Sequence, residues 1–362
     1  MGKPDPRRRY SQSVGRCAKC QAQTTAGQDQ NWIMTNCIDA FKSLNIADYN
    51  GSIFVSPCCI SPTVKSKITD FKNIQYLKDI RNSWTVQEVF PAPCNACRVA
   101  ESAGIGSRRL GANQWYEDNG YDNSEVELIR LDYWVGDTCN LRCAICGPEN
   151  SSAWKQELNV PSKLKKSVTN HFWKTMDLTT LRWVHFNGGE PLLSKTHVEF
   201  LQALPNKDQI HINYNTNATI LPDQTLLDLW QQFKLVQVDF SIDDVEQRFE
   251  YQRYPANWKQ VTNNLQWYID NAPHNCMFAV NTTVSILNHA NLDKLNLWLT
   301  NNFYVSRFTD PIAHRQQFAI ELFALDGATE RIHQIKQFLE SCDARRGTDW
   351  RATFPELVDY LG

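Results

Sequence analysis

Three closely spaced cysteines, Cys139, Cys143 and Cys146, are the residues of this sequence with the clearest chemical potential. Thiolates at this spacing can surround one inorganic centre within a tight loop, and soft thiolate ligands select zinc or an iron–sulfur cluster. A [4Fe–4S] cluster usually takes four thiolates. No fourth cysteine lies nearby, so one iron would stay open to another ligand. A zinc site completed by a distant histidine is the alternative, but zinc sites usually show paired CxxC motifs. We therefore favour iron–sulfur.

Glycine and polar residues that could hold an organic ligand end the next three predicted strands. Gly188 and Gly189 would let the backbone approach a ligand closely, and Glu190 could accept a hydrogen bond from an ammonium group. Residues 215–217 (Asn-Thr-Asn) and 241–243 (Ser-Ile-Asp) occupy the corresponding places after the third and fourth strands. The hydroxyl and carboxylate of the latter segment suit ribose hydroxyls.

A second group of thiols lies in the N-terminal third, at Cys37, Cys58, Cys59, Cys94 and Cys97. The apolar segment 53–55 follows an Asn-Gly turn signal and predicts a hairpin that delivers the adjacent pair at its end. Neighbouring side chains on an extended chain point to opposite sides, so we expect one member of the pair to be a ligand and leave open which. A unit of this size has a thin core that a metal would stabilise. A structural zinc knuckle from the same residues is the alternative.

These side chains must be positioned by an alternating pattern of strands and helices that starts near residue 126. The predicted strands are 126–135, 183–186, 210–214, 235–242, 278–285 and 318–325. The predicted helices are 194–204, 224–233, 258–271 and 292–301, and a helix with a short cap follows residue 330. Six strands over about 200 residues fit βα units, so we expect an α/β fold with a parallel sheet, either open or closed into a barrel.

The composition excludes several classes of protein. The 362 residues are 42% hydrophobic and 21% charged with a net charge of −2, which is a globular composition with no overall basic field for nucleic acid. No secretory signal and no run of eighteen apolar residues is visible, so we expect a cytoplasmic protein with reduced thiols and no membrane partner. Cys17 and Cys20 lie in a polar N-terminal arm and have no assigned role.

The CxxxCxxC motif after the first strand resembles the cluster loop of the radical S-adenosylmethionine (SAM) enzymes. The resemblance implies a partial (β/α)6 barrel of the radical SAM kind, with a [4Fe–4S] cluster whose open iron is chelated by SAM. Reductive cleavage of SAM would then give a 5′-deoxyadenosyl radical. Gly188-Gly189-Glu190-Pro191 resembles the motif that holds the SAM amino group, and Arg253 resembles an arginine that pairs with the SAM carboxylate. A surface salt bridge is the alternative for Arg253. The remaining cofactor contacts implied by the resemblance are Ile145, Asn215, Asn217, Ser241 and Asp243.

The N-terminal cysteines resemble the auxiliary-cluster domains called twitch or SPASM, although here they precede the barrel. The resemblance implies a second [4Fe–4S] cluster held by Cys37, Cys94, Cys97 and one of Cys58 or Cys59. It divides the chain into a flexible arm (1–30), an auxiliary-cluster domain (31–112), a radical SAM partial barrel (113–329) and a C-terminal helical cap (330–362).

Relatives with such domains mostly modify peptides, so we expect a ribosomally synthesised precursor peptide as substrate, with cross-linking or backbone excision as the reaction. The expected partners are reduced flavodoxin or ferredoxin as electron donor and a separate small peptide-recognition protein. Modification of RNA or a small metabolite is the enzymatic alternative, and a metal-stapled binding protein is the non-enzymatic one. The sequence identifies no general acid or base: His185 and His211 fit buried core histidines.

Overall fold

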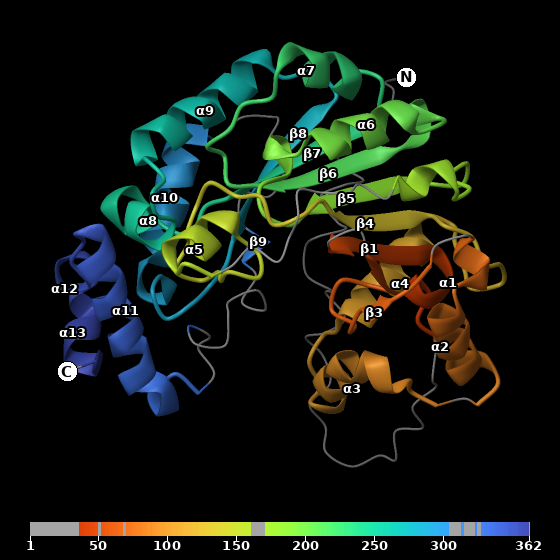
Figure 1. Ribbon diagram of the computed structural model, residues 1–362, viewed down its shortest axis with the longest axis horizontal. Coiled ribbons are helices and arrows are strands. Elements are labelled where there is room, and N and C mark those ends of the chain that lie inside the picture. Colours follow the sequence, from red (N-terminus) through yellow and green to blue (C-terminus); the bar gives the residue numbers. More distant parts are fainter. Residues whose placement is uncertain are drawn as a thin grey trace, which may run out of the picture. The chain divides into compact units, whose positions relative to one another are not determined.

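The fold is α/β with a mostly parallel arrangement of strands, as predicted (Figure 1). The computed structural model describes residues 36–49, 52–67, 70–87, 89–160, 171–303, 313–314, 323 and 327–361. The predicted arm with its two cysteines therefore lies outside the described residues. The chain divides into two compact units: Met1–Trp134, Ser167–His185 and Ala203–Asn206 form the first, and Val135–Lys166, Phe186–Gln202 and Lys207–Gly362 form the second.

The first unit is built on the predicted hairpin. Strands β1 (Ser43–Tyr49) and β2 (Ser52–Ser56) pair antiparallel, and β2 pairs in the same way with the short β3 (Val64–Lys65). Strand β1 also pairs in parallel with β4 (Arg130–Trp134), which the sequence did not predict. The helices of this unit are α1 (Asp39–Lys42), α2 (Gln75–Thr85), α3 (Asn95–Ser102) and α4 (Arg108–Asp118).

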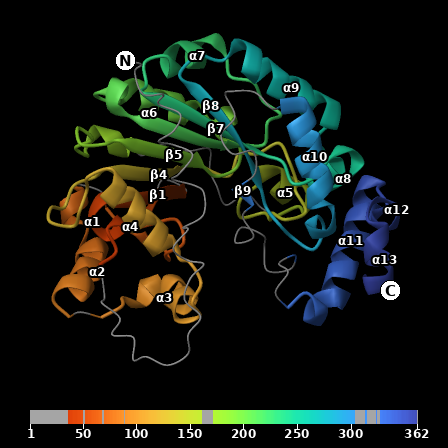
Figure 2. The same ribbon diagram turned by 180° about the vertical axis from the view of Figure 1, so that it is seen from behind.

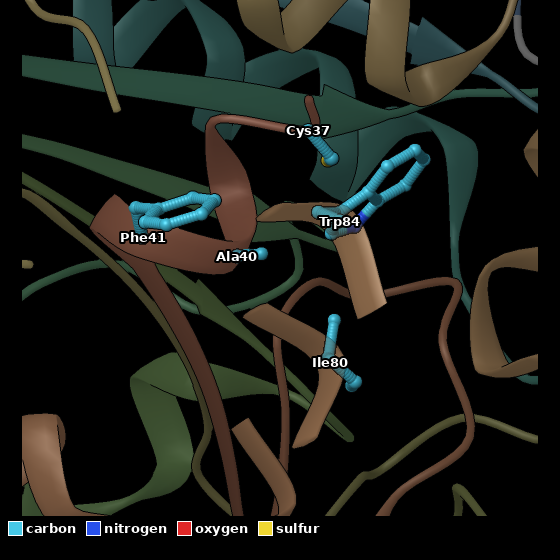
Figure 3. Packing of buried hydrophobic residues seen from close by; sticks show 5 residues of the cluster. All are labelled: Cys37, Ala40, Phe41, Ile80 and Trp84. Atoms are coloured by element: carbon cyan, nitrogen blue, oxygen red, sulfur yellow. The ribbon is translucent and has the colours of Figure 1, made fainter. Parts of the chain in front are cut away.

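A small apolar core packs α1 against α2. Helix α2 buries Leu77, Ile80 and Trp84, which recur at helical spacing along one side. Ile80 and Trp84 pack with Phe41, Ala40 and Cys37, and Figure 3 shows the Cys37 thiol beside the Trp84 indole. One of the predicted thiol ligands is therefore part of this apolar core.

The second unit alternates parallel strands with helices. Strands β6 (His211–Thr216), β7 (Leu235–Ser241), β8 (Cys276–Thr282) and β9 (Ala313–His314) pair in parallel in that order. In Figure 1 helices α6, α7 and α9 run along one face of β6–β8, and the strand interiors are almost entirely buried, as expected for parallel strands. The helices of this unit are α5 (Ser152–Glu157), α6 (Lys195–Ala203), α7 (Gln224–Trp230), α8 (Glu246–Gln252), α9 (Trp258–Asn271), α10 (Leu292–Phe303), α11 (Ile332–Arg346), α12 (Trp350–Thr353) and α13 (Val358–Leu361).

The observed elements follow the predicted ones with a few differences. Strand β5 (Trp183–Asn187) matches its prediction and crosses the division between the units. Strand β4 begins only at Arg130, because the amides of Glu127 and Ile129 bond to the carbonyls of Phe41 and Lys42 instead. Apart from Phe323, the predicted sixth strand at 318–325 lies outside the described residues.

Asparagine and aspartate caps explain where several helices begin. Asp223 accepts a hydrogen bond from the Leu226 amide before α7, and Asn257 accepts one from the Gln260 amide before α9. In the part of the chain that is described, we find no helix with both the length and the apolar character needed to cross a bilayer. The C-terminal helices α11, α12 and α13 can be followed from both sides in Figures 1 and 2.

Candidate functional site

The three thiols of the CxxxCxxC motif lie in one loop shortly after β4, as predicted. Cys143 is buried, while Cys139 and Cys146 are partly exposed. Burial is the main reason why the thiols of this loop favour their neutral form, and the neighbouring thiols add to the effect. The pKa of Cys146 is raised to about 11, and that of Cys143 is raised further. A metal centre that binds here must therefore displace protons from the thiols as it binds.

Hydrogen bonds from helix α5 fix one side of this loop. Ser151 caps α5 and its hydroxyl donates to the Leu141 carbonyl at 2.6 Å. The Trp154 indole donates to the Cys143 carbonyl at 2.9 Å. The Cys139 amide in turn donates to the Ser152 hydroxyl at 3.1 Å. A loop held in this way presents its thiols in a fixed arrangement.

The end of α8 and the residues directly after it fix the other side of the loop. The Arg142 amide donates to the Tyr254 carbonyl at 2.6 Å, and the Ala144 amide donates to the Gln252 carbonyl at 2.7 Å. The Leu141 amide donates instead to the sulfur of Cys139, a predicted ligand, at 3.4 Å. Hydrogen bonds to thiolate sulfur are one of the means by which a protein adjusts a cluster's reduction potential.

The two glycines of the Gly-Gly-Glu-Pro segment let it run directly against the start of the cluster loop. A side chain on Gly189 would collide with the Thr138 carbonyl, and Gly188 has a φ of 125°, which favours glycine. The Gly189 and Glu190 amides donate to the Gly136 and Thr138 carbonyls, both at 2.8 Å. The glycines therefore serve a close approach between two backbone segments.

Glu190 is buried, and its carboxylate accepts three hydrogen bonds. The donors are the Asn217 amide at 2.7 Å, the Thr216 hydroxyl at 2.8 Å and the Leu192 amide at 3.2 Å. Burial raises the pKa of Glu190 to about 7, although these donors oppose the shift. An ionised carboxylate has about four acceptor positions, so one remains for a further donor such as an ammonium group.

Asn217 joins the end of β6 to the cluster loop. Its side-chain amide donates to the Asn140 side chain at 3.0 Å and lies 4.0 Å from the Cys139 sulfur. The structure thus brings Glu190, Asn217 and Cys139 together, as the order of the motifs predicts. Their roles as cofactor ligands stay predictions.

Arg253 and Asp243 form a buried ion pair rather than the alternative of a surface salt bridge. Arg253 Nη2 lies 2.8 Å from Asp243 Oδ2, and both side chains are at least nine-tenths buried. The Arg253 Nε group is buried without a hydrogen-bond partner among the described residues. Burial lowers and Asp243 raises the pKa of Arg253, with a net increase, so the guanidinium stays charged. A buried, incompletely bonded cation suits a carboxylate ligand.

The other predicted cofactor contacts lie at the same ends of the strands. Ser241 on β7 is opposite Asn281 on β8, whose side-chain amide donates to Asn215 on β6 at 2.8 Å. Ile145 is buried within the cluster loop. Asn215, Ser241 and Asn281 thus add polar side chains at the ends of β6, β7 and β8.

A cavity in the first unit is lined by four of the N-terminal cysteines. Its empty volume, which includes open solvent, is about 400 Å³, and Cys37, Cys58, Cys94 and Cys97 all line it. Cys59 does not line the cavity and is exposed, so the adjacent thiols do point apart. Burial raises the pKa of Cys94 to about 12, and that of Cys37 is raised by burial, Asp39 and the three other thiols. Four thiols facing one space fit a fully ligated cluster.

Two arginines beside this cavity are paired with carboxylates. Arg108 Nε lies 3.2 Å from Asp39, and Arg109 Nε donates to Glu101 at 3.0 Å. The guanidinium of Arg109 also lies 5.9 Å from the Trp84 ring centre. Both cations would partly offset the negative charge of a thiolate-bound cluster.

Asp132 and Trp154 carry no motif and were missed by sequence reasoning. His185 Nδ1 lies 3.0 Å from Asp132 Oδ1, and Asp132 is buried. Burial opposes ionisation, but His185 and the nearby arginines hold the pKa of Asp132 well below its usual range. A carboxylate within an otherwise apolar strand was the available signal, since buried charges need partners. Trp154 gave no comparable signal, because nothing local distinguishes an indole that bonds a loop from one that only packs.

The three-thiol loop and the four-thiol cavity are the two predicted metal sites. Within the described ranges, no three His, Cys, Asp or Glu side chains converge closely enough to hold one ion. A [4Fe–4S] cluster spreads its ligands because each iron takes one thiolate. We expect the loop around Cys139, Cys143 and Cys146 to supply three such ligands and the cavity of the first unit to supply four.

Comparisons with known proteins identify a similarity in the part of the chain that contains the Cys139 loop. The sequence profile of the radical SAM superfamily matches residues 134–289. A GTP 3′,8-cyclase of Listeria welshimeri is 27% identical over 229 residues, which is 61% of this chain and 66% of the relative. A GTP 3′,8-cyclase of Actinobacillus pleuropneumoniae is 28% identical over 130 residues, which is 35% of this chain and 36% of the relative. This chain thus matches between about a third and two thirds of the length of these relatives.

Solved structures resemble this chain only distantly. Streptococcus suis SuiB bound to S-adenosylmethionine has a TM-score of 0.36 at 12% identity, covering 78% of this chain and 62% of SuiB. The protein anSMEcpe with bound AdoMet has a TM-score of 0.40 at 14% identity, covering 60% and 61%. The profile match contains the cluster loop, Glu190 and Arg253. Residues 134–289 of this chain are therefore a radical SAM superfamily domain.

Proposed function

We propose that this protein is an enzyme that cleaves SAM reductively at a cluster held by Cys139, Cys143 and Cys146. The observation that carries the proposal is a three-thiol loop whose backbone is bonded on both sides, with Glu190 and Arg253 beside it. When bound and reduced, a cluster of this kind would provide the one electron needed to cleave SAM into methionine and a 5′-deoxyadenosyl radical. The protein's part is to bind, orient and shield the reacting groups.

Each end of SAM has a complementary group in the second unit. Glu190 keeps one acceptor position for the ammonium group, and Arg253 carries an unsatisfied donor for the carboxylate. Ser241 and Asp243 are the proposed ribose contacts, and buried Ile145 would pack on the adenine. Asp243 already pairs with Arg253, so carboxylate binding would make Arg253 share its donors between two anions.

We propose a second [4Fe–4S] cluster in the first unit, ligated by Cys37, Cys58, Cys94 and Cys97. The shared cavity supports this ligand set, and Cys59 is left out because it does not line that cavity. With all four irons bound to protein, this cluster would transfer electrons or staple the thin core of the unit without binding SAM. A zinc knuckle is the competing occupant of the same thiols.

We propose a precursor peptide as substrate, with reduced flavodoxin or ferredoxin as electron donor in the cytoplasm and a small separate protein that delivers the peptide. The support is the resemblance of the cysteine pattern to twitch and SPASM proteins. The products, whether a cross-link or an excised backbone segment, belong to the same proposal.

A nucleotide substrate is the second candidate, because the curated relatives described above are named GTP 3′,8-cyclase. In the first unit Arg108 and Arg109 are each paired with a carboxylate, but Arg108 Nη2 is buried without a hydrogen-bond partner among the described residues, so this cavity does not distinguish the two substrates. Mass spectrometry of reactions with GTP and with a candidate precursor peptide separates the two. Conversion of GTP alone would contradict the peptide proposal.

The test of the central proposal is SAM cleavage by anaerobically reconstituted protein. We expect brown protein with absorbance at about 400 nm, about eight irons per chain and formation of 5′-deoxyadenosine with dithionite. Replacing Cys139, Cys143 and Cys146 by Ala should remove about half of the iron and all 5′-deoxyadenosine. Replacing Cys94 and Cys97 by Ala is the matched control, which should lose the other half of the iron and keep some SAM cleavage. A colourless protein with stoichiometric zinc would instead identify a metal-stapled binding protein.

A further inference from the structure

The last residue of helix α11, Arg346, reaches the cluster loop from more than two hundred residues away in the sequence. Its side chain is only 2% exposed, although it carries a charge. Arg346 Nη2 donates to the Arg142 carbonyl at 3.2 Å, and Arg142 lies between the first two thiol residues of the loop. Burial of an arginine is costly unless its donors are satisfied, so this contact needs a supporting environment.

Glu157, the last residue of α5, provides the countercharge. Arg346 Nε donates to one of its oxygens and Arg346 Nη2 to the other, both at 3.2 Å. Arg345 donates to the same carboxylate at 2.9 Å, and Arg142 Nε lies 3.4 Å from it. Burial opposes ionisation of Glu157, but Arg346 and Arg345 hold its pKa below the usual range. One carboxylate therefore ties the C-terminal helix to a residue of the loop.

Two aromatic rings complete the surroundings of Arg346, and both belong to residues that hold the loop. The guanidinium carbon lies 4.6 Å from the Trp154 ring centre and 4.8 Å from the Tyr254 ring centre. Trp154 bonds the Cys143 carbonyl, and the Tyr254 carbonyl accepts from the Arg142 amide. A planar guanidinium can stack on rings and fork its donors at once, which an ammonium group cannot do.

We propose that Arg346 is a positioning residue for the cluster loop, with Glu157 as its anchor. It satisfies the carbonyl of Arg142 and packs on both rings that support the neighbouring peptide groups. The C-terminal helix α11 would thus set the arrangement in which the three thiols meet a cluster. The proposal rests on the proposed function, because it assumes that these thiols bind a cluster.

The test compares Arg346→Gln and Arg346→Lys with the wild type in full-length protein. The control is Arg351→Ala, which removes an exposed arginine of the same C-terminal region that pairs with Glu340 at 2.7 Å, away from the loop. The measurements are the rate at which a chelator removes iron, the electron paramagnetic resonance spectrum of the reduced cluster with and without SAM, and amide exchange of residues 139–146 in iron-free protein.

We expect Arg346→Gln to lose iron at least about tenfold faster, because a buried carbonyl loses its donor. Its amides at Arg142 and Ala144 should also exchange faster in iron-free protein. Arg346→Lys should be intermediate, and Arg351→Ala should match the wild type. Wild-type rates of iron loss and exchange in Arg346→Gln would overturn the proposal.

The two proposals fail in different ways. A wild-type protein that binds no iron, or whose spectrum does not change with SAM, contradicts the proposed function, and the exchange measurement on iron-free protein still decides whether Arg346 orders the loop. Melting followed by circular dichroism identifies a variant that does not fold. If Arg346→Gln is such a variant, Arg346→Lys decides, because it keeps the charge and loses the fork: unchanged exchange in that variant overturns the positioning role.

Discussion

The raised pKa of Glu190 predicts that SAM binding depends on pH near neutrality. The carboxyl group is buried and its pKa is about 7, so it is mostly protonated below that value. An ammonium group needs the ionised form as its partner. We therefore expect the affinity for SAM to fall as the pH drops through about 7 and to level off above about 8.

The size of the effect follows from the ionised fraction. About nine-tenths of the Glu190 carboxyl groups are ionised at pH 8 and about one-tenth at pH 6, so the apparent dissociation constant should rise about tenfold over this range. Stability of the ligand-free protein should also depend on pH, over a range that begins lower. An acid whose pKa is raised on folding binds more protons when folded, so stability is lost as the pH rises from about 4.5 to about 7.

The assay is anaerobic equilibrium dialysis of SAM with cluster-loaded protein between pH 6 and pH 8. Glu190→Gln is the control, because its amide cannot ionise. That variant should bind SAM weakly at every pH, since the new amide group would face a donor such as the Asn217 amide. Wild-type affinity that stays constant between pH 6 and pH 8 would refute the reasoning, as would an unchanged pH dependence in Glu190→Gln.

Three further predictions address the two sites separately. Gly189→Ala should unfold at lower temperature and lose SAM binding, because its new methyl group would collide with the Thr138 carbonyl. Gly111→Ala is the control, because Gly111 lies inside helix α4 with open space around it. This control should gain about 0.5–1 kcal/mol in the free energy of unfolding by denaturant. Cys58→Ser should lose the iron of the cluster in the first unit while Cys59→Ser keeps it, as measured by iron content per chain; equal losses would remove Cys58 as the chosen ligand. Cys146→Ala should abolish the change that SAM causes in the paramagnetic resonance spectrum and leave the signal of the other cluster in place, and a surviving SAM effect would show that this thiol is not a ligand.

Local patterns in the sequence were enough to predict the repeating elements. Helix α9 begins and ends as predicted, because Asn257 caps it and a period of apolar residues runs through it. The hairpin of β1 and β2 was visible from its turn signal and from the apolar segment 53–55. The motifs at the ends of successive strands also indicated that Glu190 and Asn217 would lie near the cluster loop.

Non-local pairing could not be predicted in the same way. Nothing in the alternation of β4 indicates that β1, more than eighty residues earlier, is its parallel neighbour. Alternation indicated that Cys58 and Cys59 point apart, but only the packed helices decide which one faces the cavity. The contacts of Arg346 could not be predicted, because its partners Glu157 and Arg142 are distant from it in the sequence.

The parallel pairing of β1 with β4 has a consequence for how far the chain can be shortened. The ladder runs from Ser43 opposite Arg130 to Ala47 opposite Trp134, and the loop with the first thiol, Cys139, begins just beyond it. A chain trimmed to residues 113–362 would leave the amides and carbonyls on that side of β4 bare, and bare strand edges invite association between copies. The N-terminal segment thus covers an edge of β4, the strand that leads into the thiol loop, and cannot be removed without exposing that edge.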